Sequence, residues 1–229
     1  SRFEELFGHT AIGREPTLAH NSQMVLRLDF SVVKVEGEIG ALERAFDRAC
    51  HDAFLIFTNA HKAFAPFPAL TRGESATEML LSILRAVQVA GAPPVHIIID
   101  EYDNFTNQLI TSRQDHLYRD VTTGDSFLRT FFKVIKAGVG DGSVARVFIT
   151  GVLPVTIDDL TSGFNIAQII TLKESTLNMM GFTQAEVDTY VAEIFTENQW
   201  PDELRRRVLE DLRAHYNGYR LLPDATETL

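Results

Sequence analysis

The sequence predicts a three-layer α/β fold, in which a parallel sheet lies between helices, followed by a smaller helical region. Val95–Ile99 is a short apolar run without sustained alternation, which is typical of a strand buried on both faces of a parallel sheet. A second apolar run, Ala145–Thr150, follows a helical pattern and indicates a neighbouring parallel strand. Beyond Lys173, helical patterns dominate.

Composition limits the classes of function. The 229 residues suffice for one sizeable domain, or for a core with a small subdomain. A formal net charge of −10 argues against broad adhesion to nucleic acid or anionic membranes, and we expect the basic run Arg205–Arg207 to be a solvated helix face. No apolar run has membrane-spanning length, and the single cysteine, Cys50, suits a reducing compartment. We therefore expect an intracellular protein, cytoplasmic or nuclear.

The first half of the chain predicts one strand and two long helices. After a lead-in with a short helix at Phe3–Phe7, polar and apolar residues alternate over Gln23–Val33, which predicts a strand. The apolar face of this strand comprises Leu26, Leu28, Phe30 and Val32, and the other face comprises Arg27, Asp29 and Ser31. Apolar residues at helical spacing predict helices over Glu36–Asn59 and Ser75–Val89, the latter capped by Ser75.

Two adjacent acids, Asp100 and Glu101, end the apolar strand that begins at Val95. Open α/β sheets bind ligands outside the carboxyl ends of their strands. An Asp at such a place can hold the water shell of a Mg²⁺ ion that also contacts nucleotide phosphates, and the next Glu can polarise an attacking water. This is the arrangement of a Walker B strand with its catalytic Glu. The alternative is a strand that simply ends in solvated acids.

The segment Thr106–Gly124 is largely polar and predicts a loop at the carboxyl end of this strand. Its neighbourhood offers four candidate functional residues, each of which can also be an ordinary solvated side chain: Asn104, Arg113, His116 and Arg119. A third helix is expected over Asp125–Ala137. The glycines of Gly138–Ser143 then predict a helix-ending turn, because a phosphate-binding loop would precede a helix and carry a Lys.

The last third predicts a loop, one short strand and several helices. The loop is expected at Pro154–Asn165 and the strand, which would complete the sheet, at Gln168–Leu172. Helical patterns follow at Ser175–Met180, Thr183–Phe195 and Asp202–His215. Thr183 with Glu186 has the spacing of a capping box.

Several segments, taken in order, resemble the AAA-ATPase-like family of P-loop ATPases. The segment HIIIDEYDNF is similar to the Walker B segment of this family, and members of the family commonly carry DEYD there. Three other segments resemble family motifs in the same order: SRFEELFGHTAIG, RVFITGVLPV and HYNGYRL. The resemblance implies a P-loop NTPase-like parallel sheet in an α/β core at residues 1–172, and a helical lid at residues 173–229 that we expect to continue beyond Leu229.

The resemblance also implies cofactors and residue roles. ATP and Mg²⁺ are the implied cofactors, with Asp100 organising the metal and Glu101 activating water. Thr150 matches the residue that senses the γ-phosphate, although it can also simply end its strand. Arg220 matches a lid arginine that reaches the nucleotide, or it is a surface turn residue. The candidates for a trans-acting arginine are Arg113, Arg119 and Arg129.

The printed sequence contains no glycine-rich loop with Lys-Ser/Thr, and none of its lysines follows a glycine. We therefore expect a sheet that is incomplete at its N-terminus, with the Walker A segment upstream, two unpaired edges and an exposed apolar slot. Such a segment should be marginally stable and inactive by itself. The longer protein is then expected to be an ATPase, with a protein partner or further domains and possible oligomers. The alternative is a non-enzymatic interaction scaffold that has lost its P-loop.

Overall fold

The computed structural model describes residues 2–17, 22–35, 37–152, 167–171, 173, 176 and 181–216. The chain divides into two compact units, Ser1–Ala167 and Gln168–Leu229, which are described one at a time. Among the helices in these described stretches, none is both long enough and apolar enough to cross a bilayer.

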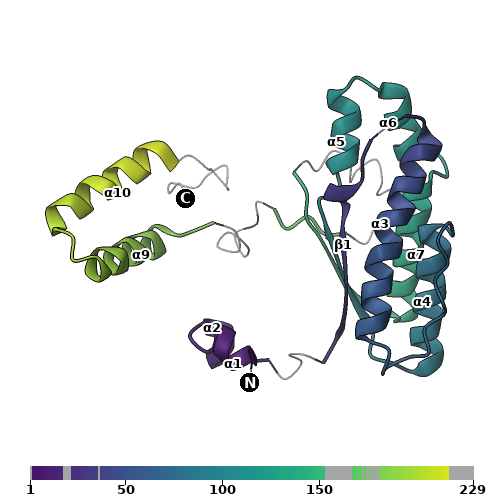
Figure 1. Cartoon of the computed structure of the whole chain (residues 1–229), viewed down its shortest axis with the longest axis horizontal. Coiled ribbons are helices and arrows are strands. Elements are labelled where there is room, and N and C mark those ends of the chain that lie inside the picture. Colours follow the sequence, from purple (N-terminus) through teal and green to yellow (C-terminus); the bar gives the residue numbers. More distant parts are fainter. Residues whose placement is uncertain are drawn as a thin grey trace. The chain divides into compact units, whose positions relative to one another are not determined.

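A three-stranded parallel sheet forms the centre of the first unit (Figure 1). Its strands are β1 (Met24–Asp29), β2 (Val95–Asp100) and β3 (Val144–Ile149), in the order β1-β2-β3. The register places Asp29 beside Asp100 and Ile99 beside Ile149. The predicted α/β class with a parallel sheet is confirmed, and β2 is the central described strand. Because β1 pairs with β2 and β2 pairs with β3, there is no place for a missing strand between these three strands, and the apolar slot expected in the sheet does not lie among them.

Helices connect the strands and cover one face of the sheet. The β1–β2 connection contains the 3₁₀ helix η1 (Phe30–Val32), α3 (Ile39–Ala60) and α4 (Ala76–Ala90). The β2–β3 connection contains α5 (Asn104–Thr111), α6 (Asp115–Thr122) and α7 (Phe127–Asp141). Figure 1 shows α3, α4 and α7 on the same side of the sheet, and α3 contacts β1 while α7 contacts β3.

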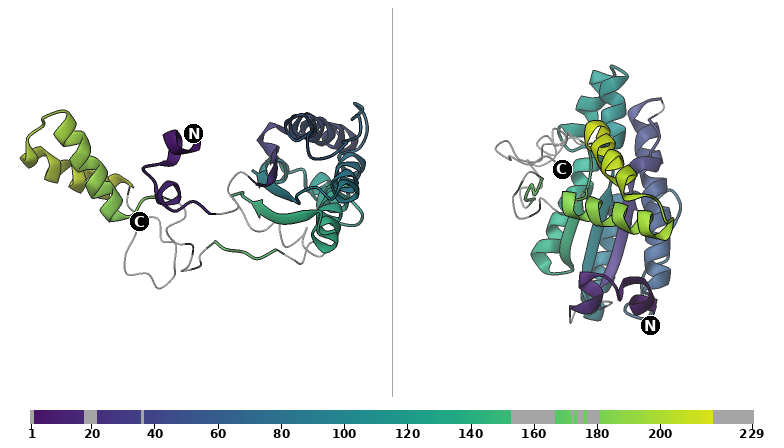
Figure 2. Two further views of the ribbon diagram at one scale, coloured as in Figure 1. Left: turned by 90° about the horizontal axis from the view of Figure 1, so that it is seen from below. Right: turned by 90° about the vertical axis from the view of Figure 1, so that its left-hand side faces the viewer.

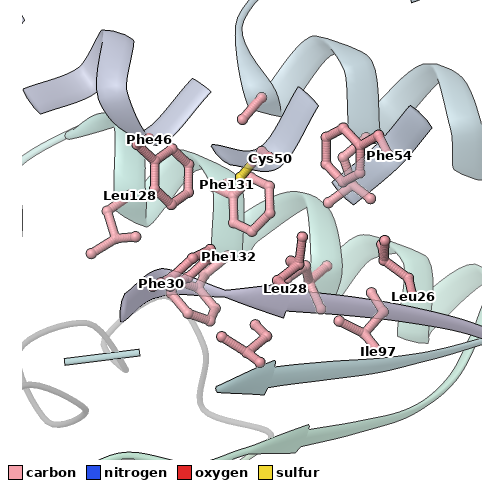
Figure 3. Close-up of a cluster of buried hydrophobic side chains, with 14 of the residues drawn as sticks. Leu26, Leu28, Phe30, Phe46, Cys50, Phe54, Ile97, Leu128, Phe131 and Phe132 are labelled. Carbon is pink, nitrogen blue, oxygen red and sulfur yellow. The ribbon is translucent and has the colours of Figure 1, made fainter. Parts of the chain in front are cut away.

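The core lies between these helices and the sheet (Figure 3). Alternate strand residues such as Leu26, Leu28 and Ile97 face it, and all are almost fully buried. Phe46 of α3 is the centre of an aromatic cluster, with ring centroids 5.0 Å from Phe30 and 5.2 Å from Phe131. Phe30 follows β1 directly, so this cluster supports the carboxyl end of the sheet.

The opposite face of the sheet is partly exposed. Val25 and Phe148 are 45% and 41% exposed, and Ile98 of the central strand is half-buried. The expectation that Val95–Ile99 is buried on both faces is therefore wrong for its second face. The sequence predicts a helical layer on each face of the sheet. Within the described residues, helices α3, α4 and α7 form the layer on one face.

Other predicted boundaries require correction. The first strand ends at Asp29, because the Asp29 carboxylate accepts a hydrogen bond of 2.9 Å from the backbone N–H of Ser31 and begins a 3₁₀ turn. Val32, expected on the apolar face, is consequently 64% exposed. Residues 168–171 form no strand, and Leu172 lies outside the described residues.

The β2–β3 connection is more helical than expected. The polar segment Thr106–Gly124 largely forms α5 and α6, because Leu109, Leu117 and Val121 bury their side chains in the core. Helix α7 continues through Gly138 to Asp141 instead of ending at Ala137, and Gly142 ends it with φ +81°.

The second unit contains α9 (Gln184–Glu197) and α10 (Asp202–Tyr216). The predicted capping box is confirmed, since Thr183 and Glu186 exchange both hydrogen bonds. Figure 2 shows the two helices as a hairpin, and they fit the expected helical lid. The predicted Ser175–Met180 helix, except for Thr176, and the whole of residues 217–229 lie outside the described residues. The N-terminal segment forms α1 (Arg2–Phe7) and α2 (Ala11–Arg14).

Candidate functional site

The candidate site lies at the carboxyl edge of the sheet, where all three strands end. Parallel pairing brings Asp29, Asp100 and Thr150 to this edge from β1, β2 and the residue after β3. In an open α/β sheet, this is the edge at which ligands bind. The structure thus brings the predicted residues Asp100 and Thr150 together and adds Asp29.

Asp100 contacts both of its neighbouring strands. The Thr150 hydroxyl donates a hydrogen bond of 2.5 Å to Asp100 Oδ1. Arg27 Nη2 on β1 lies 3.4 Å from Asp100 Oδ2, and the Asp100 side chain remains 40% exposed. One carboxylate oxygen is therefore held by a hydroxyl, while the other has only a long, solvent-screened ion pair. A cation arriving from solvent can compete for that second oxygen.

Asp29 is a second carboxylate at this edge. Hydrogen bonds from the side chain and the backbone N–H of Ser31 hold the pKa of Asp29 below its ordinary value. The positive charge of Arg27 lowers this pKa further, and partial burial opposes the shift. Asp29 therefore stays negatively charged at neutral pH.

Glu101 occupies an unusual backbone conformation directly after Asp100. Its φ of +55° lies in the left-handed region, which costs a residue with a side chain about 1–2 kcal/mol. Its carbonyl accepts a hydrogen bond from the backbone N–H of Asn104, so the turn leads directly into α5. Strained non-glycine residues of this kind concentrate at functional sites. The two adjacent acids thus differ in backbone conformation, and Glu101 is half-buried.

Asn104 and Asp103 link the strand ends to each other. Asn104 Nδ2 donates to the backbone carbonyls of Phe30 and Ser31, at 3.3 and 3.2 Å, and ties the start of α5 to the end of β1. Asp103 is fully buried, and its carboxylate accepts hydrogen bonds from the segment that follows β3. Asn104, which the sequence predicted as a candidate functional residue, thus uses its side chain to bind backbone carbonyls at this edge.

The predicted basic candidates lie elsewhere. Among the described residues, no hydrogen bond or ion pair joins Arg113, His116 or Arg119 to the acids of the site, and all three are exposed. Arg129 is half-buried on α7. Arg220 lies outside the described residues.

Three residues of this edge were missed by the sequence interpretation as functional candidates: Arg27, Asp29 and Asp103. The alternation of the first strand placed Arg27 and Asp29 on a common face, but only the register with β2 brings that face to Asp100. Asp103 belongs to the DEYD segment, yet one of its partners, the backbone N–H of Val152, lies 49 residues further along the chain.

The carboxylates at this edge are of a kind that can hold a hydrated Mg²⁺ ion. Among the described residues, no group of three or more His, Cys, Asp or Glu side chains could hold a metal ion. Mg²⁺ keeps several waters and is commonly bound through one or two carboxylates together with substrate phosphates. Asp100 and Asp29 supply two carboxylates at this edge.

Comparison with known proteins gives one family. The family model AAA-ATPase-like, described as a predicted AAA-ATPase, matches residues 1–161, which is more than half of the chain. Neither the curated proteins nor the solved structures gave a match.

Proposed function

The chain belongs to the AAA-ATPase-like family, and from this premise we propose that it is part of a module that binds ATP with Mg²⁺ and hydrolyses it. The observation that carries the proposal is the 2.5 Å hydrogen bond between Thr150 and Asp100 at the carboxyl edge of the sheet. This bond joins the Asp100 carboxylate, which can bind a metal ion, to the Thr150 hydroxyl, which can donate a hydrogen bond to a phosphate oxygen.

Asp100 is the proposed metal-binding residue, with Asp29 beside it. The partial exposure of Asp100 and its long ion pair with Arg27 leave Oδ2 accessible to a hydrated cation. Bound Mg²⁺ would neutralise charge that develops on the phosphates. The Arg27 guanidinium lies at the same edge and can attract the phosphates.

Glu101 is the proposed general base. A catalytic Glu must accept a proton from water without binding the metal itself. The positive φ of Glu101 supports this separation from Asp100, because the chain turns between the two acids.

Thr150 is the proposed phosphate-sensing residue. Its hydroxyl carries one hydrogen, which is donated to Asp100 in the structure. That hydrogen can point to Asp100 or to a phosphate oxygen, but it cannot serve both. We propose that Thr150 transfers its hydrogen bond from Asp100 to the terminal phosphate when nucleotide binds.

The remaining contacts of the nucleotide are also part of the proposal. Most phosphate contacts in P-loop ATPases come from the glycine-rich loop and its Lys, and the printed sequence contains no such motif. These residues alone should therefore bind ATP weakly. We propose that the lid helices, with Arg220 beyond α10, respond to nucleotide and act on a protein partner or a further domain.

The decisive experiment compares Mg-ATP binding and hydrolysis by the complete natural polypeptide with its Glu101→Gln and Asp100→Asn variants. The expected result is that Glu101→Gln binds ATP without hydrolysing it, while Asp100→Asn loses Mg²⁺-dependent binding. Glu203→Gln, at an exposed position on α10, is the control for loss of an acid and should behave as wild type. If the wild-type polypeptide binds no ATP, the proposal fails and the fold is an interaction scaffold.

A further inference from the structure

Asp103 is a buried carboxylate that joins its own helix, through Asn107, to the segment after β3. Asp is among the best N-cap residues, and Asp103 occupies the N-cap position of α5. Nevertheless, its side chain makes no capping hydrogen bond to that helix, although the residue is fully buried. A buried carboxylate needs hydrogen-bond partners, and those of Asp103 lie partly beyond β3.

The partners of Asp103 clamp the residues after Thr150. Both carboxylate oxygens lie 3.1 Å from the backbone nitrogen of Val152, which donates to them, and Asn107 Nδ2 donates to Oδ2 at 2.8 Å. Gly151, between Thr150 and Val152, passes so close that an added Cβ would lie 2.4 Å from Asp103 Oδ1 and from the Tyr102 ring. Only a glycine allows this approach.

Thr150 is therefore held by the end of β2 and by the DEYD segment that follows it. Its backbone N–H donates to the Ile99 carbonyl at 2.8 Å, and its own carbonyl accepts from the backbone N–H of Tyr102 at 3.1 Å. The Asp103 clamp then fixes the chain two residues later. Together these contacts determine where the Thr150 hydroxyl lies relative to Asp100.

We infer that Asp103 is a positioning residue of the nucleotide site, which acts by holding Gly151 and Val152 so that the Thr150 hydroxyl stays against Asp100. This inference rests on the proposed function. Asp103 itself touches neither nucleotide nor water in this role. Both oxygens of Asp103 act as acceptors, for the single N–H of Val152 and for Asn107 Nδ2, whereas an amide at position 103 offers one acceptor oxygen in place of two.

The test measures ATP hydrolysis by the complete natural polypeptide with Asp103→Asn. We expect kcat to fall by about 10–100-fold, with a change in KM for ATP below about 3-fold, because displaced catalytic geometry mainly affects the chemical step. The double variant Asp103→Asn/Asn107→Asp restores a donor–acceptor pair and should recover most of kcat. In a Thr150→Val background, Asp103→Asn should have little further effect. Asp125→Asn, at an exposed ion-paired acid, is the control.

Hydrogen exchange at the Val152 amide provides a readout that needs no ATP. The amide should be protected in the wild type, exposed in Asp103→Asn and protected again in the double variant. If Asp103→Asn does not fold, Asn107→Ala removes one hydrogen bond only and should give an intermediate loss of protection. Unchanged protection at Val152, or an undiminished loss of kcat in the Thr150→Val background, overturns the inference. A wild type that hydrolyses no ATP but shows the exchange pattern refutes the proposed function and leaves the clamp itself established.

Discussion

The Thr150 hydroxyl donates a 2.5 Å hydrogen bond to Oδ1 of Asp100, joining the residue after β3 to the last residue of β2. The donor and the acceptor are 50 residues apart in sequence. Because the acceptor is a charged carboxylate, the bond is of the stronger, charge-assisted kind. It fixes two neighbouring strand ends at the edge where a nucleotide would bind, and its removal has distinguishable consequences.

Thr150→Val should reduce the rate of ATP hydrolysis, while Thr150→Ser should retain most of it. Valine has nearly the same shape but lacks the hydroxyl, so Asp100 loses its donor and the phosphate loses its contact. Unfolding by urea should show a loss of about 1 kcal/mol for Thr150→Val. This is less than the roughly 1.5–3 kcal/mol of a hydrogen bond to a charged group, because Asp100 is 40% exposed and water can replace the lost donor. Equal hydrolysis rates in the two variants would show that the hydroxyl has no role in the reaction.

Glu101→Gly should stabilise the fold and abolish hydrolysis. Glycine adopts a positive φ without the steric penalty of a side chain, so we expect a gain of about 1 kcal/mol in the free energy of unfolding. Gln199→Gly is a matched control, because Gln199 has φ +53° just after α9 and should give a similar gain with unchanged activity. A loss of stability in Glu101→Gly would mean that the Glu101 side chain makes contacts that outweigh the strain.

Gly151→Ala should destabilise the fold by about 1–3 kcal/mol, because the new methyl group would overlap Asp103 and the Tyr102 ring. Gly140→Ala provides the opposite control. Gly140 lies inside α7 with no atom within 4 Å of an added Cβ, so alanine should stabilise that helix by about 0.5–1 kcal/mol. Thermal unfolding of both variants measures the contrast, and a neutral Gly151→Ala would show that the Asp103 clamp is loose.

Asp29 should contribute stability that is lost in acid. Its pKa in the folded state is lowered mainly by Ser31, so the unfolded chain binds more protons over the window below the ordinary Asp value of 3.8. The contribution is therefore complete above that value and disappears as the pH falls through the lowered pKa. The stability difference between wild type and Asp29→Asn should grow as the pH rises from about 2 to 5, as urea unfolding can measure.

Asp47 should show the opposite dependence. Burial raises its pKa in the folded state, although the Ala76 backbone N–H, 2.7 Å away, opposes the shift. The folded state then binds more protons than the unfolded state above pH 3.8, so this contribution to stability falls as the pH rises through the raised pKa. Asp47→Asn keeps an acceptor for Ala76 and should remove the fall. If the stability of Asp47→Asn relative to wild type did not increase with pH, the raised pKa of Asp47 would be contradicted.

Cys50 should be unreactive until the protein unfolds. Its thiol is fully buried in α3, and burial, with a smaller contribution from the charge of Asp47, raises its pKa well above the ordinary range. Labelling by a thiol reagent should be at least ~100-fold slower in the native protein than in urea, since it requires opening of the core. Because Cys50 is the only cysteine, the labelled fraction reports this position alone. Rapid native labelling would show that the core around α3 opens locally.

Local patterns were sufficient for much of the fold. The apolar run before Asp100 predicted β2, and helical spacing predicted α3, α4, α7, α9 and α10 to within a few residues of their ends. The segment before Asp125 was predicted as a loop, because its polar residues concealed the few apolar side chains that α5 and α6 bury. Phe30–Val32 was assigned to a strand, because the alternating pattern continues through these residues and gives no sign of the turn that the Asp29 carboxylate begins.

By itself, the sequence determined the parallel α/β core, the placement of Asp100 and Glu101 at a strand end, and the helical character of the C-terminal region. These properties follow from short-range periodicity and from the chemistry of neighbouring residues. Only the tertiary structure decided that Asp29 lies beside Asp100, that Arg27 pairs with Asp100 across 73 residues, and that Asp103 holds Val152 across 49. These contacts depend on strand register, and a slip of one residue would turn every side chain of a strand to the opposite face.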